Sequence, residues 1–141
     1  MGLEYAYDSR IVVIQLSGDY STAELRETVV RALDDRACPV DAVLLFDVRG
    51  SSVMSKRTST DVQEGAGFLA SIAPRFSQRM AFVANVDLSY GLMRMCATFM
   101  EHAGCVAEVF RELGPARAWL LAEIVPAEAT SPRAPVSRPP S

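Results

Sequence analysis

The sequence predicts a single α/β domain in which a mixed β-sheet of about five strands packs against about four helices. From residue 21 onward, short apolar runs alternate with amphipathic segments of helical period, which is the pattern of parallel β-α units. The first two apolar runs are separated only by a short polar turn, which predicts an N-terminal hairpin. With 141 residues, half of them hydrophobic, the chain has the size and composition of one globular domain.

The hairpin combines two predicted strands, 3–7 and 11–16. The second strand is rich in β-branched residues, which favour strands, and the turn pair Asp8-Ser9 separates the two. A hairpin at the start of the chain places one strand at the edge of the sheet, where it can pair with a second copy of the chain. The sequence therefore leaves both a monomer and a homodimer open.

The first helix is predicted to begin after Ser21, which has the capping-box spacing to Glu24. It should end before Pro39, because a residue that precedes proline resists the α conformation. The next run, 42–46, is apolar throughout, which predicts a strand covered on both faces. We expect this strand to lie parallel to strand 11–16 through a right-handed crossover. The buried face of the helix comprises Leu25, Val29, Ala32 and Leu33.

The polar stretch 49–60 is predicted to be a loop, and Thr60 with Gln63 is predicted to cap a second helix that ends near Pro74. Two glycines in this helix each cost ~1 kcal/mol relative to alanine, and we expect them to permit close backbone packing. The glycines are Gly65 and Gly67, and the buried side comprises Val62, Ala66, Leu69 and Ala73.

Two more strands, 80–84 and 107–110, are each followed by a helix. Gly104 ends the first of these helices, which starts at residue 88 or 89, and Pro115 suits the first turn of the second. The apolar stripe of the first is Leu92, Met95, Cys96, Phe99, Met100 and Ala103, and the second carries Ala116, Trp119, Leu120 and Ile124.

The domain is predicted to span residues 1–125 and to be followed by a disordered, proline-rich tail, 126–141. The tail has almost no large apolar residue, so it cannot offset the entropy lost on ordering.

Composition narrows the classes of function. The net charge of −3 argues against broad nucleic-acid binding, which needs clustered positive charge. The three cysteines have neither disulfide-framework nor zinc-site spacing, so we expect reduced thiols, a cytoplasmic location, and no metal or cofactor. No apolar run approaches the ~18 residues of a transmembrane helix, and the first residues lack a signal peptide's basic and apolar regions.

Four segments, in their order and spacing, make residues 3–122 resemble the SpoIIAA-like (STAS/SEC14-like) family. This family is related in fold to anti-sigma-factor antagonist (STAS) domains and to lipid-binding SEC14 domains. The resemblance implies a STAS-like fold and a bacterial regulatory or ligand-binding role. The segments are Leu45–Gly50, Arg79–Ala84, Tyr90–Met95, and Val109–Arg111 with Ala116–Leu120.

One motif of the phosphorylatable STAS domains is incomplete in this sequence. Those domains carry an Asp-Ser-Ser-Gly-type motif after the third strand, and the corresponding loop here contains Ser51 and Ser52. The aspartate directly before these serines and the glycine after them are missing, so the resemblance alone does not establish a phosphorylation switch.

The best candidate site lies where the parallel strands end, because ligands of open parallel sheets gather beyond the carboxyl ends of the strands. Arginines beside a helix N-terminus can hold an anion there. Structural roles remain open for each residue: a loop cap for Asp47, an ion pair for Arg94 and a core-edge position for Tyr90. The predicted site comprises Asp47, Arg49, Ser51, Ser52, Asn85, Tyr90 and Arg94.

Three functions follow. The first is a non-enzymatic module that binds a protein partner or a small amphipathic ligand at this rim, including a lipid-like ligand carrier. Met93, Met95 and Met100 would then form either core packing or one wall of an apolar groove. The second is a signalling switch phosphorylated at Ser51 or Ser52. An enzyme ranks last, because His102 is the only histidine and no carboxylate pair has a recognisable spacing.

Overall fold

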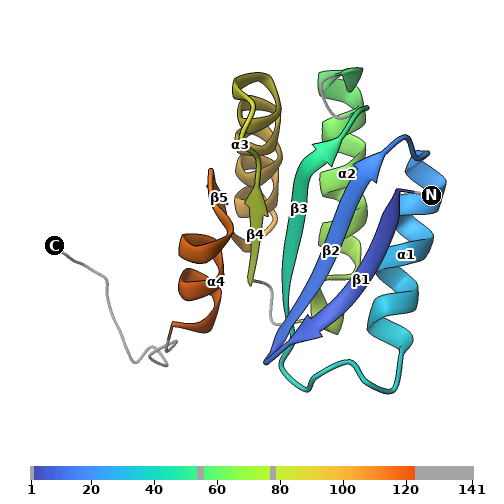
Figure 1. Ribbon diagram of the computed structural model, residues 1–141, viewed down its shortest axis with the longest axis vertical. Helices are drawn as coiled ribbons and strands as arrows, with labels where there is room; N and C mark the ends of the chain where they lie inside the picture. The colour runs from blue at the N-terminus through green and yellow to red at the C-terminus, as the bar shows by residue number, and fades with distance from the viewer. Residues whose placement is uncertain (1, 54–55, 77–78, 123–141) are drawn as a thin grey trace, which may run out of the picture.

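A computed structural model describes residues 2–53, 56–76 and 79–122, which form a five-stranded mixed sheet and four α-helices (Figure 1). The predicted tail and Ile124 lie outside the described residues. The strands are β1 (Leu3–Asp8), β2 (Ile11–Gly18), β3 (Val43–Ser51), β4 (Arg79–Val83) and β5 (Val106–Phe110). The helices are α1 (Thr22–Asp34), α2 (Ser59–Ser71), α3 (Asp87–His102) and α4 (Leu113–Leu121), with a 3₁₀ turn η2 (Ala73–Arg75).

The sheet order is β1-β2-β3-β4-β5, with β1 antiparallel to β2 and every later pair parallel. The predicted hairpin is therefore confirmed, and Ser9 adopts the left-handed conformation (φ 57°) in its turn. Leu44 lies opposite Met80, and Phe46 lies opposite Phe82. The carboxyl ends of β3 and β4 consequently meet at the same edge of the molecule, as the sequence predicts.

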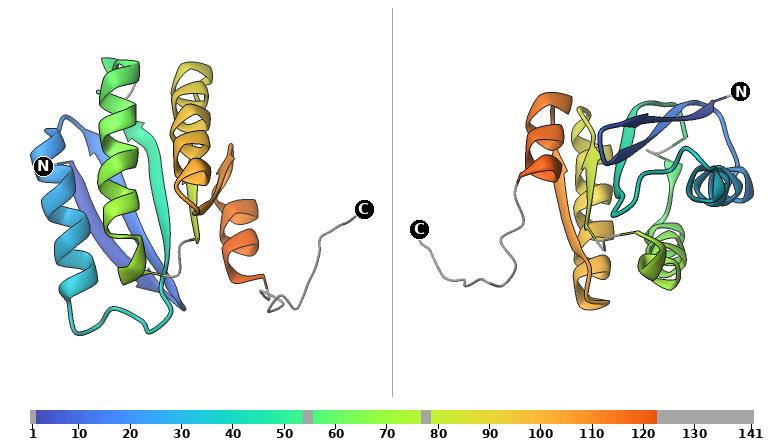
Figure 2. Two further views of the ribbon diagram at one scale, coloured as in Figure 1. Left: turned by 180° about the vertical axis from the view of Figure 1, so that it is seen from behind. Right: turned by 90° about the horizontal axis from the view of Figure 1, so that it is seen from below.

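Helices cover both faces of the sheet, but unequally. Figure 2 shows α1, α2 and α3 on one face and α4 alone on the other. The larger core lies between the sheet and α1–α3, and the smaller core lies under α4. The layers are therefore those of a three-layer α/β sandwich with one thin side.

Strand β3 supplies both cores, because successive side chains point to opposite faces. Leu44, Phe46 and Val48 belong to the larger core, whereas Val43 and Leu45 belong to the smaller one. The continuous apolar run that predicts a doubly covered strand is thus confirmed.

Two boundaries differ from the prediction. Strand β3 continues to Ser51, so the first part of the predicted loop is a strand that pairs with the end of β2. Helix α2 is capped by Thr58 with Asp61, not by Thr60 with Gln63. Both pairs have the same spacing, and the aspartate accepts the Thr58 backbone N–H at 2.9 Å.

The burial of α3 is also rotated from the predicted stripe. Met93 and Ala97 are buried together with Cys96 and Met100, whereas Ala103 is exposed. The predicted residues Leu92, Met95 and Phe99 are only partly buried at the edge of the core.

The glycines of α2 do not serve close packing, which corrects that expectation. A methyl group added at Gly65 or Gly67 would meet nothing within 4 Å. The two glycines that weaken this helix therefore lie beside open space and not against a neighbouring backbone.

The capping assignment yields a direct test. Thr58→Ala should lower the free energy of unfolding by about 1 kcal/mol, since it removes the side-chain acceptor of the Asp61 backbone N–H. Thr60→Ala should change it little, because Thr60 is an exposed residue inside the helix. Urea unfolding followed by circular dichroism measures both, and an equal loss in the two variants would contradict the assignment.

Candidate functional site

A cavity of about 90 Å³ opens between α1, α2 and the larger face of the sheet. It reaches the carboxyl halves of β2, β3 and β4 and the middle of α3, so it lies in the carboxyl half of the sheet. Its wall is almost entirely apolar. The aliphatic and sulfur-bearing members of this wall are Leu16, Leu25, Val29, Val48, Val62, Leu69, Met93 and Cys96.

Two stacked phenylalanines form part of the cavity floor. The rings of Phe46 and Phe82 lie 5.5 Å apart at an interplanar angle of 19°. They stack because the parallel register places them side by side on the same face of neighbouring strands. The floor is therefore fixed by the pairing of β3 with β4.

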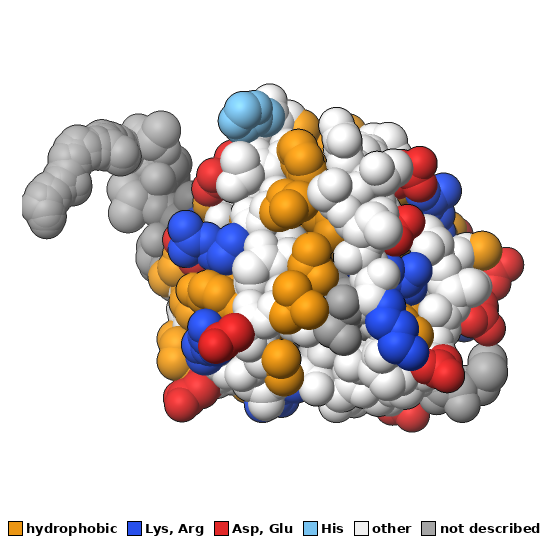
Figure 3. Space-filling model, turned by 90° about the horizontal axis from the view of Figure 1, so that it is seen from above, with side chains coloured by type: hydrophobic (Ala, Val, Ile, Leu, Met, Phe, Trp, Pro, Cys, Tyr) orange, Lys and Arg blue, Asp and Glu red, His pale blue; other side chains and the backbone are white. Residues whose placement is uncertain are grey.

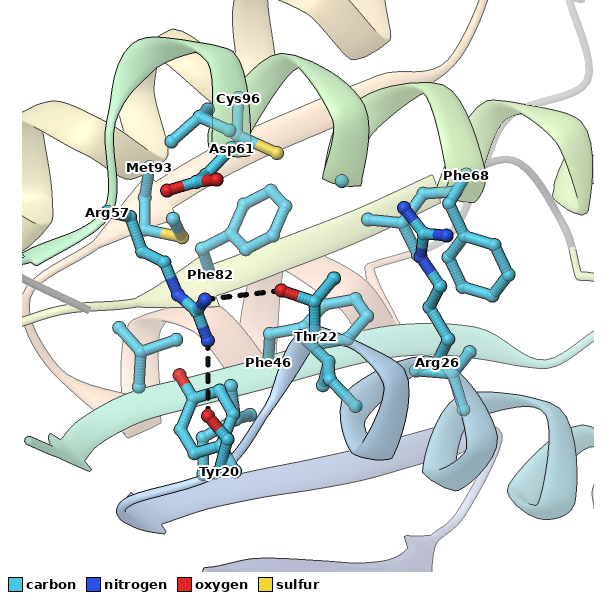
Figure 4. Close-up of a pocket in the computed structure, with 17 residues that line it drawn as sticks. Tyr20, Thr22, Arg26, Phe46, Arg57, Asp61, Phe68, Phe82, Met93 and Cys96 are labelled. Carbon is cyan, nitrogen blue, oxygen red and sulfur yellow. Dashed lines mark hydrogen bonds between the residues drawn. The ribbon is translucent and has the colours of Figure 1, made fainter. Parts of the chain in front are cut away.

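Arg57 lies at one end of the cavity and bridges to the residues that begin α1 (Figure 4). Its guanidinium donates to Thr22 Oγ1 at 3.2 Å and to the Tyr20 carbonyl oxygen at 3.4 Å. The same group lies 5.4 Å from the Tyr20 ring centre, a cation–π distance. Both hydrogen bonds are longer than the usual length of about 2.9–3.0 Å for an N–H···O bond, so they are weak.

A second arginine flanks the other end of the cavity (Figure 4). Arg26 of α1 lies over the ring of Phe68 of α2, 5.4 Å from its centre. Asp61 is the only acidic residue among those that line the cavity. Hydrogen bonds with Thr58, together with the nearby charge of Arg57, hold the pKa of Asp61 below its ordinary value. One anionic and two cationic side chains thus leave the opening with net positive charge.

The predicted rim residues occupy the same end of the molecule, but none of them lines this cavity. Asp47 and Arg49 form their own pair. Arg49 donates from Nε to Asp47 Oδ1 at 2.9 Å and from Nη2 to Oδ2 at 2.8 Å, and its backbone N–H also reaches Oδ1. By strand alternation Asp47 shares the face of Leu45, which is the α4 side of the sheet.

The side chain of Asp47 is 7% exposed, and its carboxylate is held ionised by Arg49. Burial raises the pKa of Asp47, but the hydrogen bonds and charge of Arg49 outweigh burial and leave the pKa below 3.8. The structure therefore places this predicted pair in a local ion pair.

Ser51 and Ser52 turn toward the segment that follows β2. The Ser51 hydroxyl lies 2.8 Å from the Tyr20 hydroxyl, and Ser52 Oγ donates to Asp19 Oδ1 at 2.7 Å. Because Tyr20 lines the cavity, Ser51 is the predicted residue with a direct contact to the cavity wall. Ser52 is exposed.

The remaining predicted residues lie around the start of α3. Tyr90 packs under Arg111, whose guanidinium is 4.1 Å from the ring centre and which also forms an ion pair with Asp87 at 2.8 Å. Asn85 and Arg94 are exposed and make no side-chain hydrogen bond within the described ranges. Within the part of the chain that the structure describes, the seven residues thus form separate local groups.

The end of the molecule that carries these groups also exposes apolar surface. Val86 is 54% exposed and Leu88 is 56% exposed. Figure 3 shows hydrophobic side chains in a band across this end, between basic and acidic side chains.

Few of the described residues are suited to act as a nucleophile or as metal ligands. Burial raises the pKa of Cys96 to about 12, so this cavity-lining thiol stays protonated. No group of three or more His, Cys, Asp or Glu residues suited to a metal ion occurs among residues 2–53, 56–76 and 79–122. His102 is exposed at the end of α3.

Sequence reasoning missed the residues that span from α1 to α2. Arg57 lies in a polar stretch with no periodicity, and its contacts with Tyr20 and Thr22 join segments more than 30 residues apart. One signal was present: Phe46 and Phe82 each lie near the end of a predicted strand. Two aromatic rings at matching positions of adjacent parallel strands indicate a shared surface.

Searches against protein-family models, curated proteins and solved structures found no match to this chain. In the portion that the structure describes, no helix is both long and apolar enough to cross a membrane.

The Asp47–Arg49 pair predicts a pH-dependent effect of mutation. Arg49→Gln should lower the free energy of unfolding at neutral pH by about 2 kcal/mol, because it leaves a buried carboxylate without its strongest partner. The folded pKa of Asp47 lies below its unfolded value of 3.8, so the contribution of the pair is complete above pH 3.8. It is lost as the pH falls through the folded pKa.

The difference in the free energy of unfolding between wild type and Arg49→Gln should therefore become smaller at acidic pH. Urea unfolding at a series of pH values measures it. Arg94→Gln is the control, since Arg94 is exposed and has no ion pair among the described residues. If this difference in the free energy of unfolding stayed constant down to the lowest pH, the proposed contribution of the Asp47–Arg49 ion pair would be contradicted.

Proposed function

We propose that this chain is a non-enzymatic binding module that holds a small amphipathic anion in the cavity between α1, α2 and the sheet. The observation that carries the proposal is an almost wholly apolar cavity with Arg57 and Arg26 at its ends. Apolar pockets with a few orienting polar groups are typical ligand sites. The ligand's apolar body would contact Phe46 and Phe82, and its anionic group would meet an arginine.

The size of the cavity limits the ligand. An engineered cavity of about 150 Å³ holds benzene, so the 90 Å³ seen here takes only a few carbon atoms. A longer chain would have to displace the side chains that bridge α1 and α2. A short or medium-chain carboxylate fits both the apolar wall and the positive charge of the opening.

The polar groups of the lining suit orientation of a ligand. Arg57 and Thr22 already hydrogen-bond each other, so a carboxylate can replace the Thr22 hydroxyl as an acceptor of the guanidinium. The Cys96 thiol is protonated and faces the apolar interior. These features support binding more strongly than covalent chemistry.

We further propose that the fold is STAS-like and related to the SpoIIAA-like family. The sheet order, with one antiparallel strand at the edge followed by parallel β-α units, supports this assignment. A ligand cavity would then place the chain nearer to lipid-like carriers than to phosphorylated STAS switches. A protein partner that binds at the same end of the molecule would distinguish the ligand-bound from the ligand-free protein.

A homologous ligand series tests the proposal. Butanoate, hexanoate and octanoate should raise the melting temperature, and affinity should rise about fourfold for each methylene that enters the cavity. Hexanol should bind more weakly than hexanoate because it lacks the charge that Arg57 and Arg26 receive. Isothermal titration calorimetry measures both, and an unchanged melting temperature with every member of the series would reject the cavity as a ligand site.

Two glycines of α2 provide matched variants for locating the site. Gly65 lines the cavity, whereas Gly67 is exposed and lies outside its lining. Neither position has an atom within 4 Å of an added Cβ. Gly65→Leu should fill the cavity and weaken hexanoate binding by about tenfold or more, and Gly67→Leu should leave it unchanged. Both substitutions improve helix propensity, so a stability effect common to both is separated from binding.

A second function, regulation by phosphorylation, is favoured by the contact between Ser51 and Tyr20. A phosphoryl group on Ser51 would break the 2.8 Å hydrogen bond to the Tyr20 hydroxyl and place a charge of about −2 near the cavity wall. It would draw Arg57 from its bonds with Thr22 and Tyr20. We propose that this change would alter ligand binding.

The pair Ser51→Glu and Ser52→Glu tests the regulatory function. Ser51→Glu should change hexanoate affinity, because its charge lies beside a residue of the cavity wall. Ser52→Glu should not, since Ser52 is exposed and bonded to Asp19. Intact-mass measurement after incubation with a serine kinase identifies the modified residue, and equal affinities in the two variants would remove Ser51 as the switch.

A further inference from the structure

A second polar site lies at the opposite end of the sheet from the cavity mouth, where β4 begins. Arg79 is the first residue of β4 and points toward α4. Its guanidinium lies 4.0 Å from the centre of the Trp119 ring and donates from Nη2 to the Trp119 carbonyl oxygen at 2.7 Å. The ring and the carbonyl fix the plane of the guanidinium.

The hydrogen bonding of this guanidinium is incomplete. The Nε atom is buried and has no hydrogen-bond partner among the residues that the structure describes. No acidic side chain in the described ranges forms an ion pair with Arg79. A guanidinium offers five N–H donors, and a partly buried cation is costly unless an anion accompanies it.

A second arginine increases the positive charge at this end. Arg10 directly precedes β2, and the start of β3 lies between it and Arg79 in the sheet order. Among the described residues, its side chain donates to the backbone carbonyl oxygen of Asp41, at 3.3 Å, and forms no ion pair. Burial, with the charge of Arg10 as the second cause, lowers the pKa of Arg79.

A neighbouring arginine, in contrast, has its charge neutralised by a carboxylate. Arg117 of α4 forms an ion pair with Asp8 at the end of β1. Both Arg79 and Arg10 lack such a carboxylate among the described residues. The charge excess is therefore local to these two side chains.

We propose that Arg79 and Arg10 form a binding site for a small oxyanion at the amino end of the sheet. The oxyanion has one of two sources: a free phosphate group or a carboxylate of the chain's own C-terminal segment, which continues from Ala122 with Glu123. Arginine is suited to both, because its planar donors match the oxygens of phosphate and carboxylate. Arg79 is only partly buried, so an anion can approach it from solvent.

Trp119 reports directly on this site, because it is the only tryptophan in the chain. An anion drawn to Arg79 changes the environment of the ring stacked on it. Phosphate added to the full-length protein should change the fluorescence of Trp119 in a saturable way and raise the melting temperature. Sodium chloride at equal ionic strength should not reproduce the saturable change.

Two variants separate the site from general charge effects. Arg79→Met should weaken phosphate binding by about tenfold or more, since it removes the charge-assisted hydrogen bonds. Arg94→Gln removes an exposed arginine at the other end of the molecule and should leave the titration unchanged. Equal titrations in wild type, Arg79→Met and Arg94→Gln would overturn the proposal.

The source of the oxyanion is distinguished by Glu123→Gln in the full chain. If free phosphate is the occupant, wild type and Glu123→Gln should bind phosphate with equal affinity. If Glu123 is the occupant, its replacement should shift Trp119 emission and tighten phosphate binding by removing a competitor. An absence of saturable phosphate binding in both proteins would reject the oxyanion site, whatever the outcome of the carboxylate series at the cavity.

Discussion

The parallel pairing of β3 with β4 is the constraint on which the rest of the structure depends. Its register sets Phe46 against Phe82 on the face that carries three helices. It also directs Leu45 and Asp47 to the opposite face, under α4. A shift of one residue in this register would exchange the two faces, moving a carboxylate into the larger core and an aromatic ring out of it.

Charge is distributed differently at the two ends of this sheet. At the carboxyl end, several charged groups are neutralised locally, as in the pairs Asp47–Arg49 and Asp87–Arg111. Arg57 and Arg26, which form no ion pair among the described residues, flank the cavity instead. At the amino end, Arg79 is held by an aromatic ring and a carbonyl oxygen, and no described carboxylate pairs with it. A chain with net charge −3 thus carries, at both ends of its sheet, arginines that form no ion pair among the described residues.

Most of the fold could be predicted from the sequence because it follows from local patterns. The alternation of apolar runs with amphipathic segments fixes the element order, and the length of the run at 42–46 indicates burial on both faces. The cap of α2 was misplaced because Thr58 and Thr60 each have an acidic or amide residue three positions later. The cavity could not be predicted, because Arg57 and Tyr20 come together only in the tertiary structure.

The weakness of α2 connects the fold with the proposed ligand site. Its two glycines lower helix stability by about 1 kcal/mol each, and no neighbouring atom requires a glycine at either position. This helix packs on α3, whereas arginine side chains span the space between it and α1. Among the described residues, α2 is therefore held by helix packing on the α3 side and by side-chain bridges on the α1 side. The low stability of α2 fits the proposal that the cavity binds a ligand larger than the volume of about 90 Å³ that it has in this structure.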